Sequence, residues 1–446
     1  MTRFLCIDPA GAGLDICWRA KRAGHEARLF MRRNPKTEFI GKGMVDVRFS
    51  DTHSLWYNME WADLIFLADN TRWLEEIDRF RDQHPEKHIV GPSKAAADWE
   101  LDRNVGMKVF RRHGVEVAPC REFDDYDEAI RYVLKRDCRL VSKPSGDADK
   151  ALSYCAKSPA DMVYMLQRWK NNGKLKKAPF ILQDFVDGIE MAVGGWFGPH
   201  GFSEGWCENF EFKKLCNGDL GVATGEQGTV LAYTKRSKLS DIVLAPIVPA
   251  LKRLGYIGYI DVNCIVDETG KPWPLEFTMR PGWPTFNIQQ HLHQKMDDPI
   301  EWLVDLARGE DASQFTFDKP AVGVVLSIPD YPYSHITRKE VVGVPVYGIT
   351  EGDWHWLSPC EMGFFPYPDQ KNPSASVVGP ATAGDYVCVV HGHGDTVQEA
   401  RQKVYRRLKT LLVPNSPMYR TDIGLRLGKQ LGDLQKHGYA LQFRFS

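Results

Sequence analysis

The stretch Gly255–Gly282 reads GYIGYIDVNCIVDETGKPWPLEFTMRPG, and it decides the fold of this chain. Residues Tyr259–Val266 alternate in the manner of a strand, and Trp273–Thr278 have the character of a second strand. Between them, Asp267–Lys271 is a polar segment whose Gly270 favours a turn. The stretch therefore predicts a β-hairpin.

Four oxygen-bearing side chains share one face of this hairpin, because side chains two apart on a strand point the same way. They are Asp261 and Asn263 on the first strand and Glu276 and Thr278 on the second. Such a set suits a hard divalent cation, Mg²⁺ or Mn²⁺, that shares its ligand shell with phosphates. The alternative is a solvated hairpin face. Glu276 speaks for the cation, because it lies in an apolar strand where an unpaired carboxylate is costly.

Length and composition describe an ordinary globular protein. At 446 residues the chain is expected to form about two to four domains. The formal net charge of −1 gives no strong electrostatic case for nucleic acid as a partner. The 10 cysteines are scattered without a CxxC pair, as expected of reduced thiols. The chain lacks a long apolar run and a signal peptide, so we expect a cytoplasmic protein without a membrane partner.

Residues 1–101 alternate between predicted strands and helices, which indicates an N-terminal α/β domain. Its first turn contains Gly11 and Gly13 and is similar to half of a dinucleotide fingerprint, but Ile16 stands at the place of the third glycine. A plain strand-to-helix turn is the preferred interpretation. The domain ends in GPSKAAADWE (91–100), where Ser93 is a good N-cap for the helix that follows.

The segment 102–319 mixes strands and helices and holds most of the candidate chemistry. Its strand Arg139–Lys143 ends on Lys143, and a turn of small residues leads from there to Lys150. Two lysines around a glycine-containing turn suit a polyphosphate, although two solvated lysines beside a loop are an equally good interpretation.

A second candidate segment is the strand Phe180–Phe185 with the turn that follows it. A hinge of this kind can place backbone amides against an adenine edge, with a carboxylate such as Glu190 on the ribose. In isolation the same residues are better explained as a hairpin turn. Further along, Lys213 and Lys214 lead into the glycine-rich segment 217–228, which is expected to be a loop that closes over a ligand. A helix is predicted over Asp241–Leu254 and leads into the hairpin.

Two groups of histidines are interpreted as structural. His291 and His293 are placed on a predicted helix, where residues two apart lie on different faces. His391 and His393 form an HGH sequence that resembles a metal motif, but they lie between a predicted strand and helix, where a glycine turn is the preferred reading. Both pairs are therefore discounted as metal ligands. Residues 320–446 are predicted to form a third region of strands and helices.

Several segments, kept in order along nearly the whole chain, together resemble the ATP-grasp ligases and within them the phosphoribosylamine–glycine ligases. The resemblance is carried by GPSKAAADWELDRNVGMKVFRRHGVEVAP (91–119), RLVSKP (139–144), FILQDFVDGIE (180–190), KKLCNGDLGVATGEQG (213–228), PLEFTMRPG (274–282) and MYRTDIGLR (418–426). It implies an N-terminal Rossmann-like α/β domain (1–101), a two-lobed ATP-grasp domain (102–319, mobile lobe about 122–190) and a small C-terminal α+β domain (320–446).

The resemblance also implies roles for individual residues. ATP phosphates would be held by Lys143, with Lys150 nearby, and by one of Lys213 or Lys214. The adenine hinge would consist of Gln183, Asp184, Phe185 and Val186, and Glu190 would hold the ribose. Glu276 would bind Mg²⁺, and Arg280 would contact the γ-phosphate or the acyl phosphate. The implied setting is purine biosynthesis by a cytoplasmic monomer or homodimer.

The departures from this family concentrate around the substrates. Thr278 replaces the usual asparagine metal ligand, and Asp261 is an acid that the family does not usually have, so Asp261 with Asn263 is expected to compensate. After Arg280 the chain has Gly282-Trp283-Pro284-Thr285 where the family has two acidic residues. Gln183 stands where an acid is usual.

The preferred hypothesis is an ATP-dependent, ADP-forming carboxylate–amine ligase that works through an acyl phosphate. It would join an amino acid such as glycine to the amine of a nucleotide-type substrate. One alternative is a diverged ligase with a different amine acceptor, for instance a modified nucleobase. Another is a catalytically inactive nucleotide-binding module.

Overall fold

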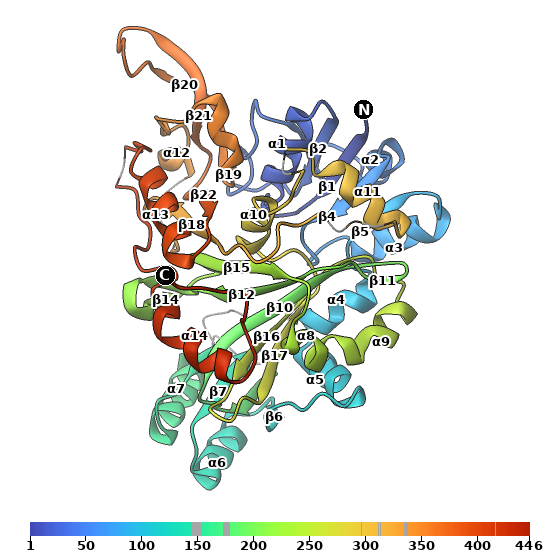
Figure 1. Cartoon of the computed structure of the whole chain (residues 1–446), viewed down its shortest axis with the longest axis vertical. Helices are drawn as coiled ribbons and strands as arrows, with labels where there is room; N and C mark the ends of the chain where they lie inside the picture. The colour runs from blue at the N-terminus through green and yellow to red at the C-terminus, as the bar shows by residue number, and fades with distance from the viewer. Residues whose placement is uncertain are drawn as a thin grey trace.

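The computed structural model describes residues 1–144, 153–172, 179–295, 297–310, 312, 314–333, 338–414 and 416–446. A parallel sheet near the N-terminus lies at one end of the molecule and a four-stranded sheet lies at the other (Figure 1). A nine-stranded sheet lies between them. This mixture of parallel and antiparallel sheets with helices confirms the α/β fold class expected from the sequence.

The N-terminal part is a five-stranded parallel sheet of order β3-β2-β1-β4-β5. Its elements are β1 (Arg3–Ile7), α1 (Leu14–Arg22), β2 (Glu26–Met31), β3 (Asp46–Phe49), α2 (Leu55–Trp61), β4 (Leu64–Leu67), α3 (Leu74–Gln83) and β5 (His88–Val90). Every residue of β4 is buried, as expected for a parallel strand covered on both faces. The chain continues from β1 to β2 and β3 on one side of the sheet, and then returns to β4 and β5 on the other side. The carboxyl ends of β1 and β4 therefore border a switch-point crevice.

Two helices, α4 (Lys94–Leu101) and α5 (Arg103–Arg112), lead from this sheet into the rest of the molecule. Ser93 Oγ accepts a hydrogen bond of 3.2 Å from a backbone N–H in the first turn of α4, which confirms the predicted N-cap. Phe110 of α5 stacks on Phe277 with ring centroids 4.0 Å apart. This stacking holds α5 against the hairpin.

The four-stranded sheet has the order β6-β9-β7-β8. Its elements are β6 (Cys120–Phe123), α6 (Tyr126–Arg136), β7 (Leu140–Pro144), β8 (Tyr154–Cys155), α7 (Pro159–Asn172) and β9 (Phe180–Asp184). Leu140 and Leu182 belong to the apolar core that the sheet shares with α6 and α7. The opposite face carries Lys143, which lies beside Ile181 of β9.

The nine-stranded sheet has the order β17-β16-β10-β12-β15-β18-β22-β19, with β11 paired to β10. Its strands are β10 (Ile189–Gly198), β11 (Gly201–Phe202), β12 (Trp206–Glu211), β15 (Gly228–Thr234), β16 (Gly258–Val266), β17 (Pro272–Thr278), β18 (Ala321–Ser327), β19 (Leu357–Pro359) and β22 (Tyr386–His393). Strands β16 and β17 are the predicted hairpin. Strand β15 pairs with β18, so the sheet runs on past residue 320, where a domain boundary was predicted.

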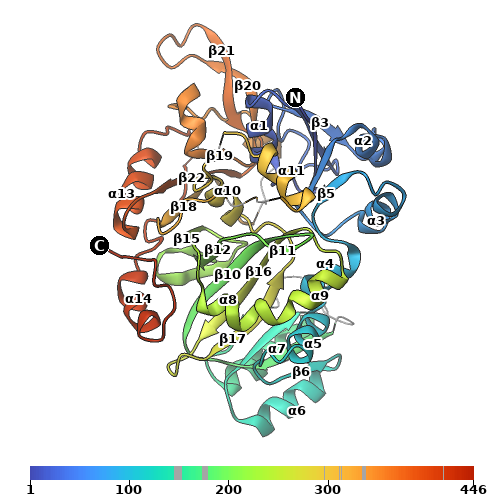
Figure 2. The same ribbon diagram turned by 45° about the vertical axis from the view of Figure 1, so that its right-hand side comes forward.

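The remaining elements cover or extend this sheet (Figure 2). They are β13 (Lys214–Cys216), η2 (Asn217–Asp219), β14 (Leu220–Ala223), α8 (Lys238–Val243), η3 (Ala245–Ile247), α9 (Val248–Arg253), α10 (Thr285–Gln290), α11 (Ile300–Arg308), α12 (Arg338–Val341), η4 (Glu351–His355), β20 (Met362–Pro368), β21 (Ser376–Thr382), α13 (Val397–Leu408) and α14 (Leu427–Lys436). The β20–β21 hairpin projects from one end of the molecule (Figure 1).

Three local predictions are wrong. The single helix expected over 241–254 is divided into α8, η3 and α9, because Pro246 and Pro249 cannot donate the hydrogen bonds of one continuous helix. The glycine-rich loop expected at 217–228 contains a short β-hairpin, β13–β14. The HGH sequence is the end of strand β22 and not a turn.

The predicted helix carrying His291 and His293 ends at Gln290, before either residue. The His291 ring instead contacts the rings of His391 and His393, each at a centroid distance of 4.9 Å. His293 stacks on Trp302 at 4.4 Å.

His293 makes the stability of the fold depend on pH. Its side chain is buried, and within the described part of the chain neither ring nitrogen has a hydrogen-bond partner. Burial lowers the pKa of His293 to about 3, whereas the unfolded chain has an ordinary imidazole. Below about pH 6.5 the imidazole therefore binds a proton in the unfolded state but stays neutral in the folded state. The free energy of unfolding consequently falls as the pH falls.

We expect His293→Phe, which keeps a ring against Trp302, to remove this contribution. When the pH falls from 7.5 to 5.5, the unaltered protein should lose about 1.4 kcal/mol more of its free energy of unfolding than the variant loses. Urea denaturation at the two pH values measures the difference. An equal change in both proteins would show that His293 does not titrate on unfolding.

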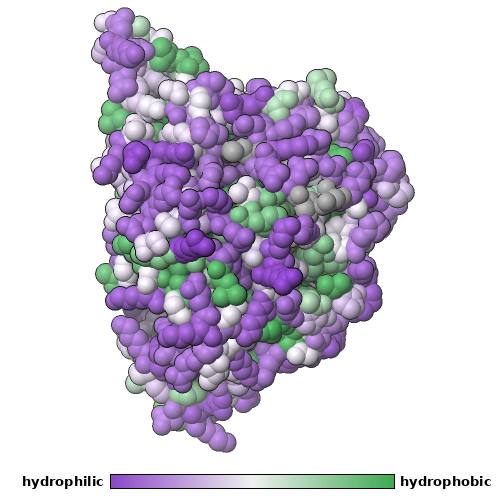
Figure 3. Space-filling view, in the orientation of Figure 1, coloured by the Kyte–Doolittle hydropathy of each residue, from purple (hydrophilic) through white to green (hydrophobic). Residues whose placement is uncertain are grey.

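The face seen in Figure 3 is predominantly hydrophilic, with hydrophobic residues in small separate patches. Among the described residues, no helix is long and apolar enough to cross a membrane.

Candidate functional site

The predicted oxygen donors lie together on one face of the nine-stranded sheet. In the register of the hairpin, Asp261 lies opposite Thr278, and Asn263 lies opposite Glu276. Residues opposite each other in an antiparallel pair share a face, and so do residues two apart on one strand. All four side chains therefore belong to the same face.

The neighbouring strand β10 makes room for these groups. Gly194 of β10 lies opposite Asp261. A Cβ atom at this glycine would come within 2.1 Å of the Tyr259 hydroxyl and 2.7 Å of Asp261 Oδ2. Glycine at this position thus leaves the space that the buried carboxylate occupies.

The Asp261 carboxylate is only half satisfied. Its Oδ2 accepts hydrogen bonds from Asn209 Nδ2 at 3.0 Å and from the Tyr259 hydroxyl at 3.1 Å. Its Oδ1 is buried and has no hydrogen-bond partner among the residues that the structure describes. Burial, and then the negative charge of Glu211, raise the pKa of Asp261 to about 7.

Glu276 has a different environment. Its carboxylate forms an ion pair with Arg103 of α5. Burial alone would raise the pKa of Glu276, but the positive charges of Arg103, Lys213 and Lys143 outweigh it and lower the pKa to about 2. Glu276 is thus held as an anion among three cations.

Lys213 is the cation at the centre of this cluster. Its Nζ lies 3.0 Å from Glu190 Oε1 and 2.9 Å from Glu211 Oε2. Burial by itself would lower the pKa of Lys213, but Glu190, Glu211 and Glu276 raise it well above the ordinary value. Lys213 therefore stays charged.

Lys143 approaches the same cluster from the four-stranded sheet. Burial, and then the charge of Arg103, lower the pKa of Lys143 to about 8, while Glu276 acts in the opposite direction. The two sheets thus place charged side chains against each other across one site. Lys150, also predicted to bind phosphates, lies outside the described residues.

The donor set fits a hard cation that completes its shell from a ligand. Besides Asp261 Oδ1, the buried oxygens Asn209 Oδ1 and Glu226 Oε1 have no hydrogen-bond partner within the described ranges. Unpaired buried oxygens are costly, and a divalent cation satisfies them. In the described part of the chain, no three His, Cys, Asp or Glu side chains form a complete metal cage. Mg²⁺ does not need such a cage when phosphates share its shell.

The predicted adenine hinge begins on the same sheet as Lys143. Gln183 of β9 is buried and lies opposite Val141 on the face that carries Lys143. Asp184 forms an ion pair with Arg136. The ring of Phe185 lies under the Arg139 guanidinium, with 3.6 Å between the guanidinium carbon and the ring centroid. Val186, the last hinge residue, follows β9 and precedes β10 and Glu190.

Arg280 lies on the N-terminal side of the site. Its Nη2 is 3.1 Å from Glu100 Oε1 of α4. Burial would lower the pKa of Arg280, but Glu100, Asp69 and Asp8 raise it. Glu276 contributes in the same direction, so Arg280 lies between the hairpin carboxylate and the parallel sheet.

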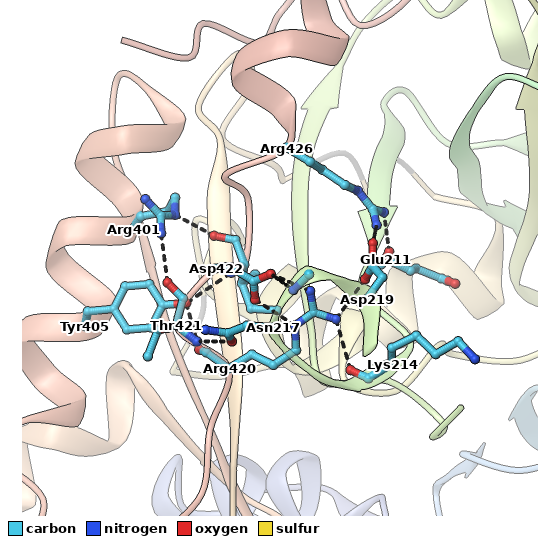
Figure 4. A network of polar contacts seen from close by, with 12 residues as sticks. Glu211, Lys214, Asn217, Asp219, Arg401, Tyr405, Arg420, Thr421, Asp422 and Arg426 are labelled. Carbon is cyan, nitrogen blue, oxygen red and sulfur yellow. Dashed lines mark hydrogen bonds and ion pairs between the residues drawn. The ribbon is translucent and has the colours of Figure 1, made fainter. Parts of the chain in front are cut away.

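Two arginines from the C-terminal segment hold the backbone on either side of Lys213 (Figure 4). Arg426 Nη2 donates to the carbonyl oxygen of Glu211 at 2.6 Å, and Arg420 Nη1 donates to that of Lys214 at 3.0 Å. The guanidinium carbons lie 4.0 Å (Arg426) and 5.3 Å (Arg420) from the ring centroid of Phe212. We call these two arginines the C-terminal clamp.

The clamp also holds the β13–β14 hairpin. Arg420 Nη1 lies 2.9 Å and Arg426 Nη1 3.1 Å from the two carboxylate oxygens of Asp219. Asp422 Oδ2 accepts a hydrogen bond from Gly218 N at 2.8 Å. The β13–β14 hairpin is therefore held by residues far away in the sequence, since 204 positions separate Gly218 from Asp422.

We expect Arg426→Ala to lower kcat about tenfold while the KM for ATP changes less, because the change loosens the backbone of Lys213 without removing its charge. Arg426→Lys should not restore kcat, since a lysine cannot reproduce the planar donors or the stacking on Phe212. Steady-state ADP release measures both constants. Lys429→Ala, an exposed change in α14, the helix that Arg426 caps, is the control. Equal kcat values for the two alanine variants would show that the clamp does not support the reaction.

Three charged residues of the site were not predicted. They are Arg103 of α5, Glu211 of β12 and Glu226, which precedes β15. The strand alternation of β12 offered one signal, since Asn209 and Glu211 lie two apart and share a face. Arg103 and Glu226 reach the site through tertiary contacts, for which the local pattern holds no signal.

Several curated relatives of this chain are named phosphoribosylamine–glycine ligase. A phosphoribosylamine–glycine ligase from Neisseria meningitidis serogroup B is 26% identical over 356 residues, covering 75% of this chain and 78% of the relative. No established protein-family model matches the chain.

Solved structures with a similar fold are less similar to this chain in sequence. The phosphoribosylamine–glycine ligase of Thermotoga maritima superposes with a TM-score of 0.70 at 18% identity, covering 94% of this chain and 100% of that one. The biotin carboxylase domain of the Hydrogenobacter thermophilus 2-oxoglutarate carboxylase, solved with MgADP, ADP and bicarbonate, superposes with a TM-score of 0.63 at 13% identity, covering 99% and 97%. These likenesses confirm the fold expected from the sequence.

Proposed function

We propose that this chain, an ATP-grasp ligase similar to the phosphoribosylamine–glycine ligases, joins a carboxylic acid to an amine through an acyl phosphate, with conversion of ATP to ADP. One observation carries the proposal: Lys143 of the four-stranded sheet lies in one charged cluster with Glu190 and Glu276 of the nine-stranded sheet and with Lys213, which lies between β12 and β13. Cations and carboxylates in this arrangement suit a metal–triphosphate complex gripped between two sheets.

In this proposal the nucleotide lies between the two sheets. Lys143 and Lys213 bind the phosphates as point charges, and Glu190 accepts hydrogen bonds from the ribose hydroxyls. The backbone of Gln183, Asp184, Phe185 and Val186 borders the adenine. The four-stranded sheet supplies the hinge and Lys143, and the nine-stranded sheet supplies Glu190 and Glu276.

Mg²⁺ would be held by Glu276 and Asp261, with Asn263 and Thr278 as neutral donors on the same face. When bound, it would offset the negative charge of the phosphates during transfer. The Arg103 ion pair keeps Glu276 ionised before the ligand arrives. Asp261 adds the carboxylate that compensates for threonine at position 278.

The chemistry needs no nucleophile from the protein. An oxygen of the substrate carboxylate attacks the γ-phosphorus, the bond from that phosphorus to the β,γ-bridging oxygen breaks, and ADP leaves. The amine nitrogen then attacks the acyl carbon, loses a proton, and phosphate departs. Lys213 and Arg280 stabilise the charge of the moving phosphoryl group, and positioning supplies the rest of the rate enhancement.

Water must be excluded because it would hydrolyse the acyl phosphate. The β13–β14 hairpin is the proposed cover. It adjoins Lys213 directly in the chain, and the C-terminal clamp contacts both its base at Lys214 and its turn at Asp219.

The test is ADP release by purified protein with ATP, Mg²⁺ and a panel of amino acids combined with amines. We expect ADP and phosphate to appear only when both an acid and an amine are present. ADP release without an amine would indicate hydrolysis of the acyl phosphate. Nucleotide binding without turnover under every mixture would reject the ligase proposal in favour of a binding module.

A further inference from the structure

The loop between β1 and α1 lies where ligands bind in open α/β sheets. Asp8 follows β1, and Ala68 and Asp69 follow β4, so all three lie at the carboxyl ends that border the switch-point crevice.

This crevice faces the reaction centre proposed above. Trp283, in the segment that follows β17, donates a hydrogen bond of 3.1 Å from Nε1 to the carbonyl oxygen of Ala68. The Arg280 guanidinium interacts electrostatically with both Asp69 and Asp8. The crevice is thus next to the part of the site that is left for the acceptor amine.

A glycine-rich loop that opens a helix is normally a receptor for phosphate, because several backbone N–H groups point at one anion. Here the backbone N–H groups are already used. Asp8 Oδ1 accepts from Ala10 N at 2.8 Å and from Gly11 N at 3.0 Å, and Asp8 Oδ2 accepts from Gly13 N at 2.7 Å. The Asp8 side chain is fully buried, so the protein supplies its own anion to this loop.

The carboxylates beside the loop oppose a second anion, and the nearby cation, Arg280, is already paired with Glu100. The nearby charge of Asp69 adds to burial in raising the pKa of Asp8 to about 6, which leaves Asp8 ionised at pH 8. Asp69 accepts hydrogen bonds from Thr71 and forms no ion pair among the described residues. A phosphate entering the loop would have to displace one carboxylate and lie beside another.

We propose that Asp8 is a specificity-determining residue that closes the β1–α1 loop to phosphate, and that the acceptor is an amine without a phosphate group. This inference rests on the proposed function. It separates the chain from its relatives, whose name specifies phosphoribosylamine, a phosphorylated amine. Like those relatives the chain would make a carbon–nitrogen bond, but to a different class of acceptor.

The first experiment measures phosphate binding and needs no turnover. Inorganic phosphate is titrated calorimetrically at pH 8 with saturating MgADP, which blocks the nucleotide phosphate positions. Asp8→Ala should bind phosphate at least tenfold more tightly than the unaltered protein. Asp8→Asn, which keeps one acceptor oxygen but removes the charge, should bind phosphate with an affinity between those of the other two proteins. Equally tight binding by all three proteins would overturn the inference.

The second experiment uses the unaltered protein and covers the case in which Asp8→Ala does not fold. ADP release is compared for pairs of amines that differ only in a phosphate group, such as ribosylamine and phosphoribosylamine. We expect kcat/KM to be at least tenfold higher for the amine without phosphate. A preference for the phosphorylated amine would overturn the inference and leave the ligase proposal intact. Absence of turnover with every amine would instead reject the ligase proposal, and the phosphate titration would still decide the role of Asp8.

Discussion

Replacing Lys213 with alanine is expected to lower kcat/KM for ATP by about 100-fold or more. Lys213 is the cation that lies within 3.0 Å of two carboxylates, Glu190 and Glu211. Removing it would take away a preorganised charge from the phosphoryl group and leave those carboxylates to repel ATP. The loss of one such charge or donor costs about 10²–10³ in rate. Initial rates of ADP release over a range of ATP concentrations measure the effect.

Lys214→Ala is the matched control, since it removes the same side chain one position later. Lys214 takes part in the C-terminal clamp through its backbone carbonyl, which alanine keeps. Its side chain extends away from the two arginines (Figure 4) and forms no ion pair within the described residues. We expect its kcat/KM to stay within about threefold of the unaltered value. The opposite ranking would transfer the phosphate role to Lys214.

Replacing Glu276 with glutamine is expected to abolish measurable turnover and to weaken Mg²⁺-dependent nucleotide binding at least tenfold. Glutamine keeps the size of the side chain but removes the charge held among Arg103, Lys143 and Lys213. A neutral amide is a poorer ligand for a hard cation than a carboxylate. Calorimetric titration with ADP, with and without Mg²⁺, separates the loss of the metal from the loss of the nucleotide.

Two further variants make this result specific. Glu268→Gln removes a carboxylate from the exposed turn of the same hairpin and should leave turnover and Mg²⁺ dependence unchanged. Thr278→Asn, which adds an amide oxygen, should raise the affinity for Mg²⁺ or leave it unaltered. An active Glu276→Gln protein with normal Mg²⁺ dependence would remove Glu276 from the metal site.

The local geometry that the structure confirms is encoded within single elements. The hairpin register follows from the alternation in Tyr259–Val266 and the turn at Gly270, and a register once set places four side chains on one face. The strand that ends on Lys143 was found in the same way. In both cases the sequence alternates with a period of two residues, which is the period at which side chains alternate between the faces of a strand.

What escaped prediction depends on contacts between distant elements. The partner of Glu276 is Arg103, and no local pattern relates a residue on α5 to a carboxylate on β17. His291 was assigned to a helix from its neighbours, yet its ring contacts follow from the packing of β22. The helix predicted over 241–254 is interrupted for a local reason, since Pro246 and Pro249 lack the backbone N–H groups that a continuous helix requires.

The C-terminal clamp has a consequence for how the protein is made. Arg420 and Arg426 leave the ribosome after the strands and lysines that they hold, because translation runs from the N-terminus. A growing chain can therefore form all three sheets before Lys213 acquires its support. A premature stop shortly before residue 420 would remove the clamp together with α14 and its buried residues Leu427, Leu431 and Leu434, so we expect the shortened product to lack the proposed phosphoryl transfer and to consume no ATP by that route.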